Sequence, residues 1–300
     1  MKILLLGKNG QVGWELQRSL APLGELVALD RHSTTAADGG CGDLTNLTGL
    51  RETVQRLRPT VIVNAAAHTA VDKAESEADL ARTVNAVAPG ALADAAREVD
   101  ALLVHYSTDY VFDGSGSTPW REDSATGPLS VYGQSKLEGE HAIAAARARH
   151  LILRTSWVYA ARGGNFARTM LRLARERERL TVIDDQWGAP TGAELIADVT
   201  AHAIRDALDE PARCGTYHLA AAGEATWHAY ARFVLDTARL LQPGLAIQAQ
   251  EVAPVATSAF PTPARRPQNS RLDTTRLRET FGLSLPHWQV GVRRMLAEIL

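Results

Sequence analysis

A tyrosine and a lysine four positions apart are the residues of this chain best suited to acid–base chemistry. They stand in the segment Tyr-Gly-Gln-Ser-Lys, from Tyr132 to Lys136, and this spacing puts both on one face of a helix. An ammonium beside a phenol stabilises the phenolate and lowers a tyrosine pKa that is otherwise near ~10. The pair therefore predicts a proton donor that works at neutral pH, although the same spacing is common by chance on helix surfaces.

Ser107, Thr108 and Asp109 end an apolar run and supply neighbouring polar groups. Ligands of doubly wound sheets bind at the carboxyl ends of the strands, so we expect Thr108 and Asp109 to face the same site as Tyr132. There Thr108 would donate a hydrogen bond to a substrate carbonyl, Tyr132 would deliver a proton, and Lys136 would hold a nicotinamide ribose. Taken singly, these three have ordinary alternatives, namely a turn cap, a half-buried aromatic ring and a solvated charge.

A glycine-rich turn near the start of the chain predicts where a dinucleotide would bind. The pattern Gly7-x-x-Gly10-x-x-Gly13 follows a short apolar run and opens a helical pattern. Glycines let the backbone turn tightly and approach a pyrophosphate, which sits at the helix N-terminus. The alternative is an ordinary glycine turn, but the position between a strand and a helix favours dinucleotide binding.

Asp30 ends the second apolar run and bears on the choice of coenzyme. A carboxylate at this place binds the adenosine ribose hydroxyls and favours NAD over NADP. Arg31 and His32 follow directly and could accommodate a 2′-phosphate. The residues therefore leave NADH and NADPH both open, and a turn residue at a strand end is the alternative role for Asp30.

Apolar runs and helical patterns alternate through the first half of the chain. This alternation predicts an α/β fold, a Rossmann-type doubly wound parallel sheet covered by helices on both faces. The second half is less regular, so we expect residues 1–160 to form mainly the dinucleotide-binding domain and 161–300 mainly a smaller substrate lobe, with chain crossings between them. Strands are expected at 2–6, 25–30, 60–64, 101–107 and 151–155, helices at 11–23, 44–57, 73–99 (one or two), 132–146, 166–178, 193–208, 226–241 and 288–300, and long loops at 243–271.

The composition excludes several classes of function. The chain has 300 residues, a hydrophobic fraction of 45% and a formal net charge of −2, so it can bury a full core and has no basic surplus for nucleic acid or membrane surfaces. No apolar run reaches the 18 residues of a spanning helix. Cys41 and Cys214 form neither a metal pattern nor a disulfide framework. We expect a cytoplasmic protein with two free thiols.

Several segments together resemble the dTDP-4-dehydrorhamnose reductase family of the extended short-chain dehydrogenases/reductases. The resemblance covers nearly the whole chain and includes the glycine turn, the Ser-Thr-Asp-Tyr strand end and the Tyr-x-x-x-Lys pair. One departure is the stretch Thr34–Gly42, which is a few residues longer than is typical and lies near the adenosine end. The segments that carry the resemblance are residues 7–16, 68–75, 107–112, 132–136, 154–159, 165–167, 188–194 and 264–267.

The resemblance implies roles for individual residues. Trp157 would lie against a sugar ring, with a core tryptophan as the alternative, and Arg265 and Arg266 would face a diphosphate, with solvated loop arginines as the alternative. Thr108, Asp109 and Trp157 match substrate positions. Tyr132 and Lys136 match positions that serve both cofactor and catalysis, and the remaining cofactor positions are Gly7, Gly10, Gln11, Val12, Gly13, Asp30, Asp43, Leu44, Ala67, His68, Thr69 and Tyr106.

The activity implied is NAD(P)H-dependent reduction of the C4 ketone of dTDP-4-dehydro-β-L-rhamnose to dTDP-β-L-rhamnose, the last step of dTDP-L-rhamnose biosynthesis. A 4,6-dehydratase or epimerase of the same superfamily is the first alternative. A dehydratase typically carries a glutamate directly after the Thr-Asp pair, where this chain has Tyr110. A non-catalytic dinucleotide-binding regulatory relative is the second alternative, although it would not need Thr108, Tyr132 and Lys136 together.

The resemblance also implies an assembly. Glu15, Glu194 and Glu298 match positions where some members place carboxylates around Mg²⁺ at a homodimer interface, and a cation would offset the repulsion between them. The alternative is three solvated surface glutamates. Sequence spacing alone does not establish that three such distant residues converge.

Overall fold

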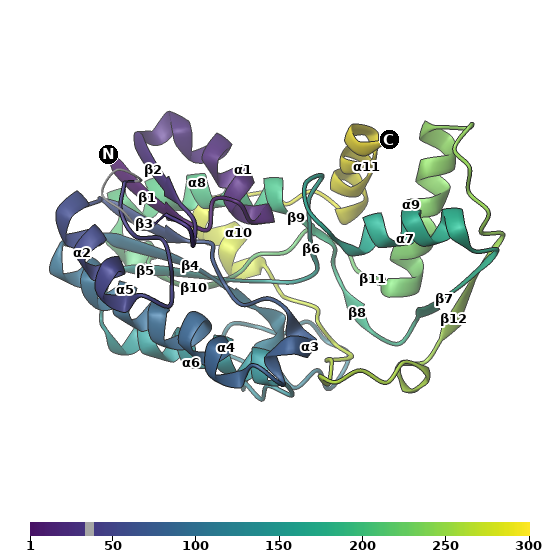
Figure 1. The fold of residues 1–300 in the computed structure, drawn as a ribbon, viewed down its shortest axis with the longest axis horizontal. Helices are drawn as coiled ribbons and strands as arrows, with labels where there is room; N and C mark the ends of the chain where they lie inside the picture. Colours follow the sequence, from purple (N-terminus) through teal and green to yellow (C-terminus); the bar gives the residue numbers. More distant parts are fainter. Residues whose placement is uncertain (34–38) are drawn as a thin grey trace.

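A six-stranded parallel sheet forms the centre of the computed structural model, which describes residues 1–33 and 39–300 (Figure 1). The strand order is β10-β5-β4-β3-β1-β2, and every neighbouring pair is parallel. This arrangement confirms the predicted α/β fold with a doubly wound sheet. The strands are β1 (Lys2–Leu6), β2 (Glu25–Leu29), β3 (Val61–Asn64), β4 (Leu102–Thr108), β5 (His150–Thr155) and β10 (Gly215–His218).

Helices cover both faces of this sheet because its strands are apolar on both sides. Ile3 and Leu5 of β1 pack into a core with α1 and α8, whereas Leu4 and Leu6 pack into a second core with α2, α5 and α6. Alternate residues of one strand thus supply two separate cores. The covering helices are α1 (Gln11–Leu20), α8 (Ala193–Asp209), α2 (Leu47–Leu57), α5 (Ala88–Glu98) and α6 (Val131–Ala145).

A second group of elements lies to the right in Figure 1 and has its own core. Two parallel strands pair there, β7 (Arg179–Ile183) with β12 (Glu251–Val255). Helix α9 (Trp227–Leu241) contacts both strands and also packs against two further helices, α7 (Phe166–Glu176) and α11 (Trp288–Ile299). Shorter pairings complete this region, namely β6 (Val158–Tyr159) with β9 (Thr191–Gly192) and β8 (Trp187–Gly188) with β11 (Ala225–Thr226).

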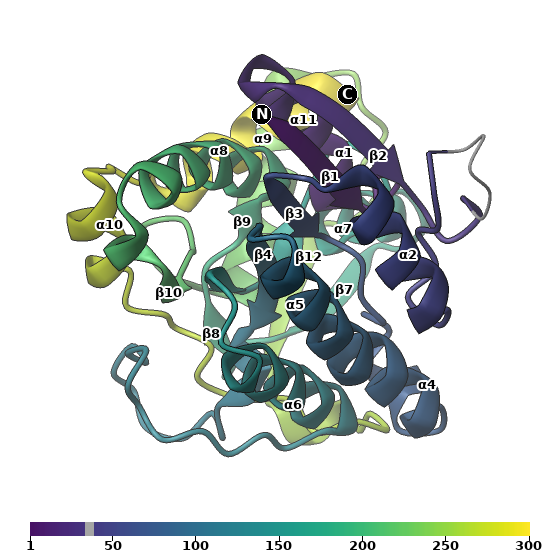
Figure 2. The same ribbon diagram turned by 90° about the vertical axis from the view of Figure 1, so that its left-hand side faces the viewer.

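The chain enters this second group after β5 and later returns to the main sheet. Helix α8 packs against α1, and β10 pairs with β5 at the sheet edge. Helix α10 (Thr275–Phe281) contacts both α8 and β10 (Figure 2). Within the described residues, none of the helices is both long and apolar enough to cross a membrane.

Several predicted element boundaries are wrong. Helix α2 begins at Leu47, not at residue 44, because the Asn46 side chain accepts a hydrogen bond from the Gly49 N–H (2.9 Å) and caps the helix. Strands β7, β10 and β12 were not predicted. The stretch expected as one or two helices is divided into α3 (Val71–Ala74), α4 (Ala78–Arg82), a π-helical turn η2 (Thr83–Val87) and α5. Residues 34–38 of the long stretch Thr34–Gly42 lie outside the described residues.

Candidate active site

The switch point of the sheet, between the carboxyl ends of β1 and β3, carries the glycine turn. Gly7 has a φ of +89°, and a Cβ built on it would lie 2.7 Å from the Ala66 backbone nitrogen. A Cβ on Gly13 would overlap the Gly7 carbonyl. Only glycine, at position 7 and at position 13, allows the backbone to approach its neighbours so closely. Doubly wound sheets bind dinucleotides at this switch point.

The N-terminus of α1 directly follows the glycine turn. Its N-cap residue, Gly10, makes no side-chain capping hydrogen bond, so the first-turn N–H groups are left to a ligand such as a phosphate. Val12 packs partly against the core of the α1 and α8 face. The Gln11 side chain instead donates to the Gly164 carbonyl (2.6 Å), which ties the turn to the loop before α7.

Asp30 lies at the end of β2 and organises the loops around it. Its carboxylate accepts hydrogen bonds from Asn9 Nδ2 (2.5 Å) and from the His32 N–H (2.8 Å), and it lies 3.9 Å from Lys8 Nζ. Burial works against the charged form, but the His32 N–H and the Lys8 ammonium prevail and lower the pKa of Asp30. Asp30 is therefore an ionised carboxylate at the place predicted for the adenosine ribose, while Arg31 and His32 are exposed.

The other predicted adenosine-side residues have varied surroundings. Asp43 Oδ1 accepts from the N–H and hydroxyl of Thr45, and the Leu44 side chain is buried in the core beside α2. Ala67 and His68 are half-buried after β3, and Thr69 is exposed. His68 Nε2 lies 2.9 Å from Glu77 Oε2.

Asn85, a residue that sequence reasoning missed, joins this loop to the catalytic helix. It is fully buried in the π-helical turn η2, accepts from the His68 N–H (2.8 Å) and donates to the His68 carbonyl (3.0 Å). It also donates to Ser135 Oγ (3.0 Å), which in turn donates to the Tyr132 carbonyl (2.8 Å). Turns of this π type often occur at functional sites. This signal was available in the structure and not in the sequence.

Local contacts fix the start of α6, which carries Tyr132 and Lys136. Ser130 caps the helix by accepting from the Gly133 N–H (3.2 Å), and Glu75 accepts from the Val131 N–H (2.9 Å). Gly133 lies so close to the Tyr110 carbonyl that a Cβ there would overlap it. The helix is thus placed directly against the carboxyl end of β4.

Thr108, Asp109 and Tyr132 come together at that strand end. Thr108 Oγ1 donates to Asp109 Oδ1 (3.1 Å), and the Tyr132 ring packs edge-on against Tyr110 with centroids 5.5 Å apart. Burial raises the pKa of Asp109 to about 6. Ser107 Oγ and Thr155 Oγ1 are buried without a hydrogen-bond partner in the described part of the chain. Polar atoms of this kind are available to a ligand.

Lys136 was predicted to lower the pKa of Tyr132. In the polypeptide without coenzyme it does not, and that prediction is wrong. Burial raises the pKa of Tyr132 to about 12, with the Thr108 hydroxyl opposing part of the shift. Lys136 Nζ instead donates to the Tyr106 carbonyl (2.6 Å) and lies 3.1 Å from His105 Nε2. Burial also lowers the pKa of Lys136 to about 8. Lys136 therefore loses its positive charge more easily than an exposed lysine, and the expectation depended on that charge.

Tyr106 contributes to this site through its backbone. Its phenol points to the opposite face of the sheet and hydrogen-bonds Thr200 of α8 (2.8 Å). Its carbonyl holds Lys136, as described above. A cofactor role for Tyr106 would therefore fall to main-chain atoms, because the ring packs against the α1 and α8 core.

Trp157 forms half of an aromatic wall. It adopts a left-handed backbone conformation, with a φ of +47°, and its ring stacks on Trp227 with centroids 3.6 Å apart. A Cβ on Gly188 would lie 2.6 Å from the Trp157 ring, so glycine is needed there. Non-glycine residues in this conformation often mark functional sites, and the half-buried indole keeps a surface that could contact a ligand.

The two loop arginines differ from each other. Arg266 forms two hydrogen bonds with Asp72 (2.8 and 3.1 Å), and the Ala264 N–H donates to the same carboxylate (3.2 Å). The Arg266 hydrogen bond is the main cause that lowers the pKa of Asp72. Arg266, which was predicted to face a diphosphate, is thus paired with Asp72 of α3, whereas Arg265 is exposed.

The three predicted metal-site glutamates lie near one another without forming a complete ligand set. Burial raises the pKa of Glu194 and the Arg294 guanidinium opposes the shift, while Glu15 and Glu298 add to it by repulsion. Glu15 pairs with Arg18 (3.4 Å) and Glu194 with Arg294 (3.4 Å). Among residues 1–33 and 39–300, no group of three or more His, Cys, Asp or Glu side chains is arranged to hold a metal ion.

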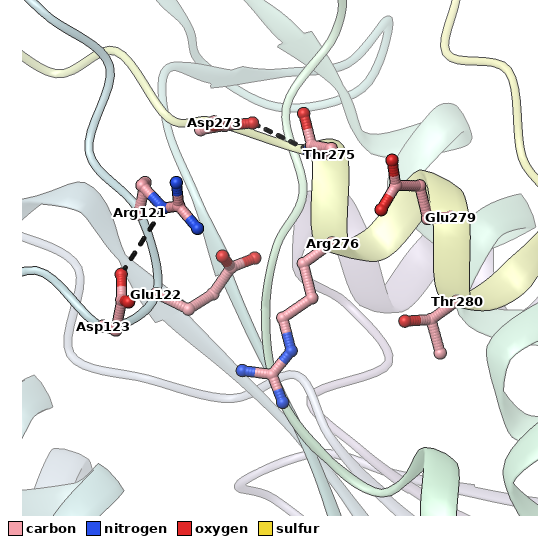
Figure 3. A pocket seen from close by; sticks show the side chains of 8 residues that line it. All are labelled: Arg121, Glu122, Asp123, Asp273, Thr275, Arg276, Glu279 and Thr280. Carbon is pink, nitrogen blue, oxygen red and sulfur yellow. Dashed lines mark hydrogen bonds and ion pairs between the residues drawn. The ribbon is translucent and has the colours of Figure 1, made fainter.

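A polar hollow of about 350 Å³ lies elsewhere, between the loop after Trp120 and α10 (Figure 3). Its lining mixes charges, and Arg121 pairs with Asp123 there at 3.6 Å. None of the predicted catalytic, cofactor or substrate residues lines it. The lining residues are Arg121, Glu122, Asp123, Asp273, Thr275, Arg276, Glu279 and Thr280.

Comparison with known proteins identifies the family. The family described as "RmlD substrate binding domain" matches residues 1–300. The dTDP-4-dehydrorhamnose reductase of Shigella flexneri is 60% identical over 299 residues, covering 100% of this chain and 98% of that protein. The chain belongs to the dTDP-4-dehydrorhamnose reductase family.

Solved structures of the dTDP-4-dehydrorhamnose reductase family share the whole fold. A reductase from Clostridium acetobutylicum is 35% identical with a TM-score of 0.88, and the match covers 100% of this chain and 99% of that one. The reductase of Bacillus anthracis, solved in complex with NADP, is 34% identical with the same TM-score, and the match covers 99% of both chains. The family resemblance inferred from the sequence motifs is thus confirmed.

Asp109→Asn should stabilise the protein in a pH-dependent way. The pKa of Asp109 is about 6 in the folded protein and 3.8 in its ordinary state, so between these values the unfolded chain releases a proton that the native state keeps. Raising the pH through this window therefore costs native stability, up to about 3 kcal/mol above pH 6. Thermal melts should show a gain for Asp109→Asn that is small at pH 4 and full at pH 7.5.

Asp94→Asn, at an exposed carboxylate of α5, is the control for the exchange of a carboxylate for an amide. A gain from Asp109→Asn that is equal at pH 4 and pH 7.5 would contradict a raised Asp109 pKa.

Proposed function

We propose that this protein reduces the C4 ketone of dTDP-4-dehydro-β-L-rhamnose to dTDP-β-L-rhamnose with NADPH or NADH, as the last step of dTDP-L-rhamnose biosynthesis. The observation that carries the proposal is the packing of α6, which bears Tyr132 and Lys136, against the end of β4 with Thr108, in a chain of this family. We further propose that the enzyme is cytoplasmic and has no nucleic acid or membrane partner.

The chemistry assigned to the chain is proton delivery and positioning. Reduced nicotinamide, when bound, supplies the hydride for the ketone carbon. Thr108 donates a hydrogen bond to the ketone oxygen, and Tyr132 then transfers its phenolic proton to that oxygen as the alkoxide forms. A pKa raised to about 12 keeps Tyr132 protonated before the reaction, and Lys136 stabilises the phenolate that the transfer leaves.

The proposed division of labour follows the two groups of elements. Residues 1–160 hold mainly the coenzyme, and residues 161–300 hold mainly the sugar nucleotide, with α8 and β10 returning to the first group. Asp109 and Trp157 serve as substrate residues. The coenzyme residues are Gly7, Gly10, Gln11, Val12, Gly13, Asp30, Asp43, Leu44, Ala67, His68, Thr69, Tyr106, Tyr132 and Lys136.

The residue after the Thr-Asp pair favours a reductase over a dehydratase. Tyr110 occupies this position, and burial raises its pKa above the ordinary value. A phenol that stays protonated cannot act as the base that water elimination from a 4-keto sugar requires. Retention of all three catalytic groups also argues against a non-catalytic regulatory role.

Tyr132→Phe tests the assignment of the proton donor. The variant keeps the ring and removes the phenol, so the turnover number should fall by at least the ~10²-fold typical of a positioned general acid. The assay is NADPH absorbance with dTDP-4-dehydro-β-L-rhamnose, with identification of the product sugar nucleotide. The dissociation constant for NADPH should change little.

Tyr217→Phe is the matched control, because Tyr217 lies on β10 with its phenol on the Arg213 carbonyl. If folded wild-type protein does not oxidise NADPH in the presence of this sugar, the proposed function is wrong. Near-normal turnover by Tyr132→Phe would remove Tyr132 from the mechanism.

Both coenzymes are proposed to work, with the Asp30 charge opposing NADPH. The Bacillus anthracis relative was solved with NADP, and the ionised Asp30 would repel a 2′-phosphate. Asp30→Asn keeps an oxygen that can accept from the His32 N–H but removes the charge. The ratio of catalytic efficiencies, NADPH over NADH, should rise several-fold, and an unchanged ratio would place the adenosine ribose elsewhere.

A magnesium-linked homodimer is a separate proposal. Burial and mutual repulsion raise the pKa of Glu194 beside Glu15 and Glu298, and a divalent cation shared with a second copy would relieve that repulsion. Light scattering should give a dimer mass with Mg²⁺ and a smaller mass with EDTA. A dimer indifferent to EDTA, or a monomer with Mg²⁺ at every protein concentration, would rule out this role for the three glutamates.

A further inference from the structure

A buried polar pair lies behind the catalytic lysine. Asn64 and His105 are opposite residues of the parallel pair β3 and β4, on the face covered by α6. Both are 1% exposed, in strands that are otherwise apolar at this depth. His105 Nδ1 lies 3.2 Å from Asn64 Nδ2, and His105 Nε2 lies 3.1 Å from Lys136 Nζ. The mechanism described above gives His105 and Asn64 no task.

The backbone sets the direction of these hydrogen bonds. Asn64 Oδ1 accepts from the Ala66 N–H (3.2 Å), so the amide group that faces His105 is the NH₂ donor. His105 Nδ1 must then accept, and the proton of the neutral ring is carried on Nε2. Burial and the Lys136 charge hold the pKa of His105 well below its usual range, so the ring is neutral.

This direction has a consequence for Lys136. An ammonium has three donors and no acceptor, so a ring N–H opposite it gives two donors face to face. An uncharged amine, in contrast, can accept from His105 Nε2–H while still donating to the Tyr106 carbonyl. A charged Lys136 needs the other ring tautomer and a turned Asn64 amide, which gives up the Ala66 N–H.

We propose that His105, oriented by Asn64, is a positioning residue that fixes the Lys136 nitrogen and couples the charge of Lys136 to the tautomer of the His105 ring. The pair favours the uncharged amine, and the charged form requires the pair to rearrange. This inference rests on the proposed function, since Lys136 matters there as a cation beside the coenzyme and Tyr132.

The other groups around Lys136 do not replace this control. Glu140 follows it by one helical turn and attracts the ammonium, but its carboxylate is already paired with the buried Arg154 of β5 (2.6 Å). Tyr132, on the same helix, is protonated. Among the described residues, the polar contacts of Lys136 Nζ itself are with His105 and the Tyr106 carbonyl.

Binding of NADPH as a function of pH, without sugar, is the first test. If binding needs the charged lysine, affinity should be constant below the Lys136 midpoint and fall about tenfold per pH unit above it. Asn64→Asp is nearly isosteric, and its carboxylate can accept from His105 Nδ1–H. The ring nitrogen that faces Lys136, Nε2, then carries no proton and can accept from the ammonium. The midpoint, measured by calorimetry, should move up by about one pH unit or more.

The double variant separates this coupling from the bare charge of the new carboxylate. In the His105→Leu background, Asn64→Asp should move the midpoint by less than half as much, because the ring that transmits the effect is gone. His218→Gln is the matched buried-histidine control on β10 and should leave the midpoint where it is in the wild type. Equal shifts with and without His105 would overturn the proposal.

The second test uses the wild-type protein and needs neither substrate nor a variant. Nitrogen-15 NMR of labelled histidine should show His105 neutral from pH 6 to 10, with the proton moving from Nδ1 to Nε2 as pH rises and with the midpoint of NADPH binding. One tautomer throughout, or an imidazolium forming near pH 6.5, would overturn the coupling. This readout stays valid if the sugar is not reduced, so failure of the proposed function is distinguishable.

Discussion

The burial of one cationic side chain, Lys136, is the constraint on which the site depends. Only 2% of this residue is exposed, and a charge so placed needs partners or loses its proton. The fold supplies the Tyr106 carbonyl at 2.6 Å as an acceptor, and a neutral imidazole lies 3.1 Å from the same nitrogen. Both come from β4, so the strand that ends at Thr108, directly before Asp109, also holds the lysine of α6.

The contact between β4 and α6 depends on residues that are far apart in the sequence. Helix α6 must approach β4 closely for Lys136 to reach Tyr106, and Gly133 permits that approach. Asn85 then ties α6 to the His68 loop, so one buried amide positions both segments. The ion pair between Arg266 and Asp72 holds the loop around Arg266 against α3.

The sequence was sufficient for the local features of this arrangement. Alternating apolar and helical patterns predicted the parallel sheet, and the glycine turn was placed between its first strand and helix. The segment 243–271 was expected to be loop because of its proline and alanine, yet β12 forms there by pairing with β7, about 70 residues earlier. Such pairing depends on tertiary contacts that a local pattern does not contain.

The site was predicted unevenly for the same reason. Thr108, Tyr132 and Lys136 carry recognisable types and spacing. His105 is a polar residue within an apolar run, and its role depends on a cross-strand neighbour and on a helix 31 residues later. The Tyr132 pKa was also misjudged, because four-residue spacing predicts that two side chains share a face, not which partner the lysine chooses.

The polypeptide alone keeps Tyr132 protonated, and in the proposed mechanism Lys136 stabilises the Tyr132 phenolate only once the coenzyme is bound. Carbon-13 NMR of tyrosine labelled at Cζ would follow the Tyr132 phenol directly, with Tyr132→Phe for assignment. In the protein without coenzyme, we expect no ionisation below pH 11, consistent with a pKa of about 12. With NADP⁺ added, the midpoint should fall by about 1–3 pH units, the shift that a nearby opposite charge produces. Ionisation near neutral pH without coenzyme, or the same midpoint with and without NADP⁺, would contradict this account.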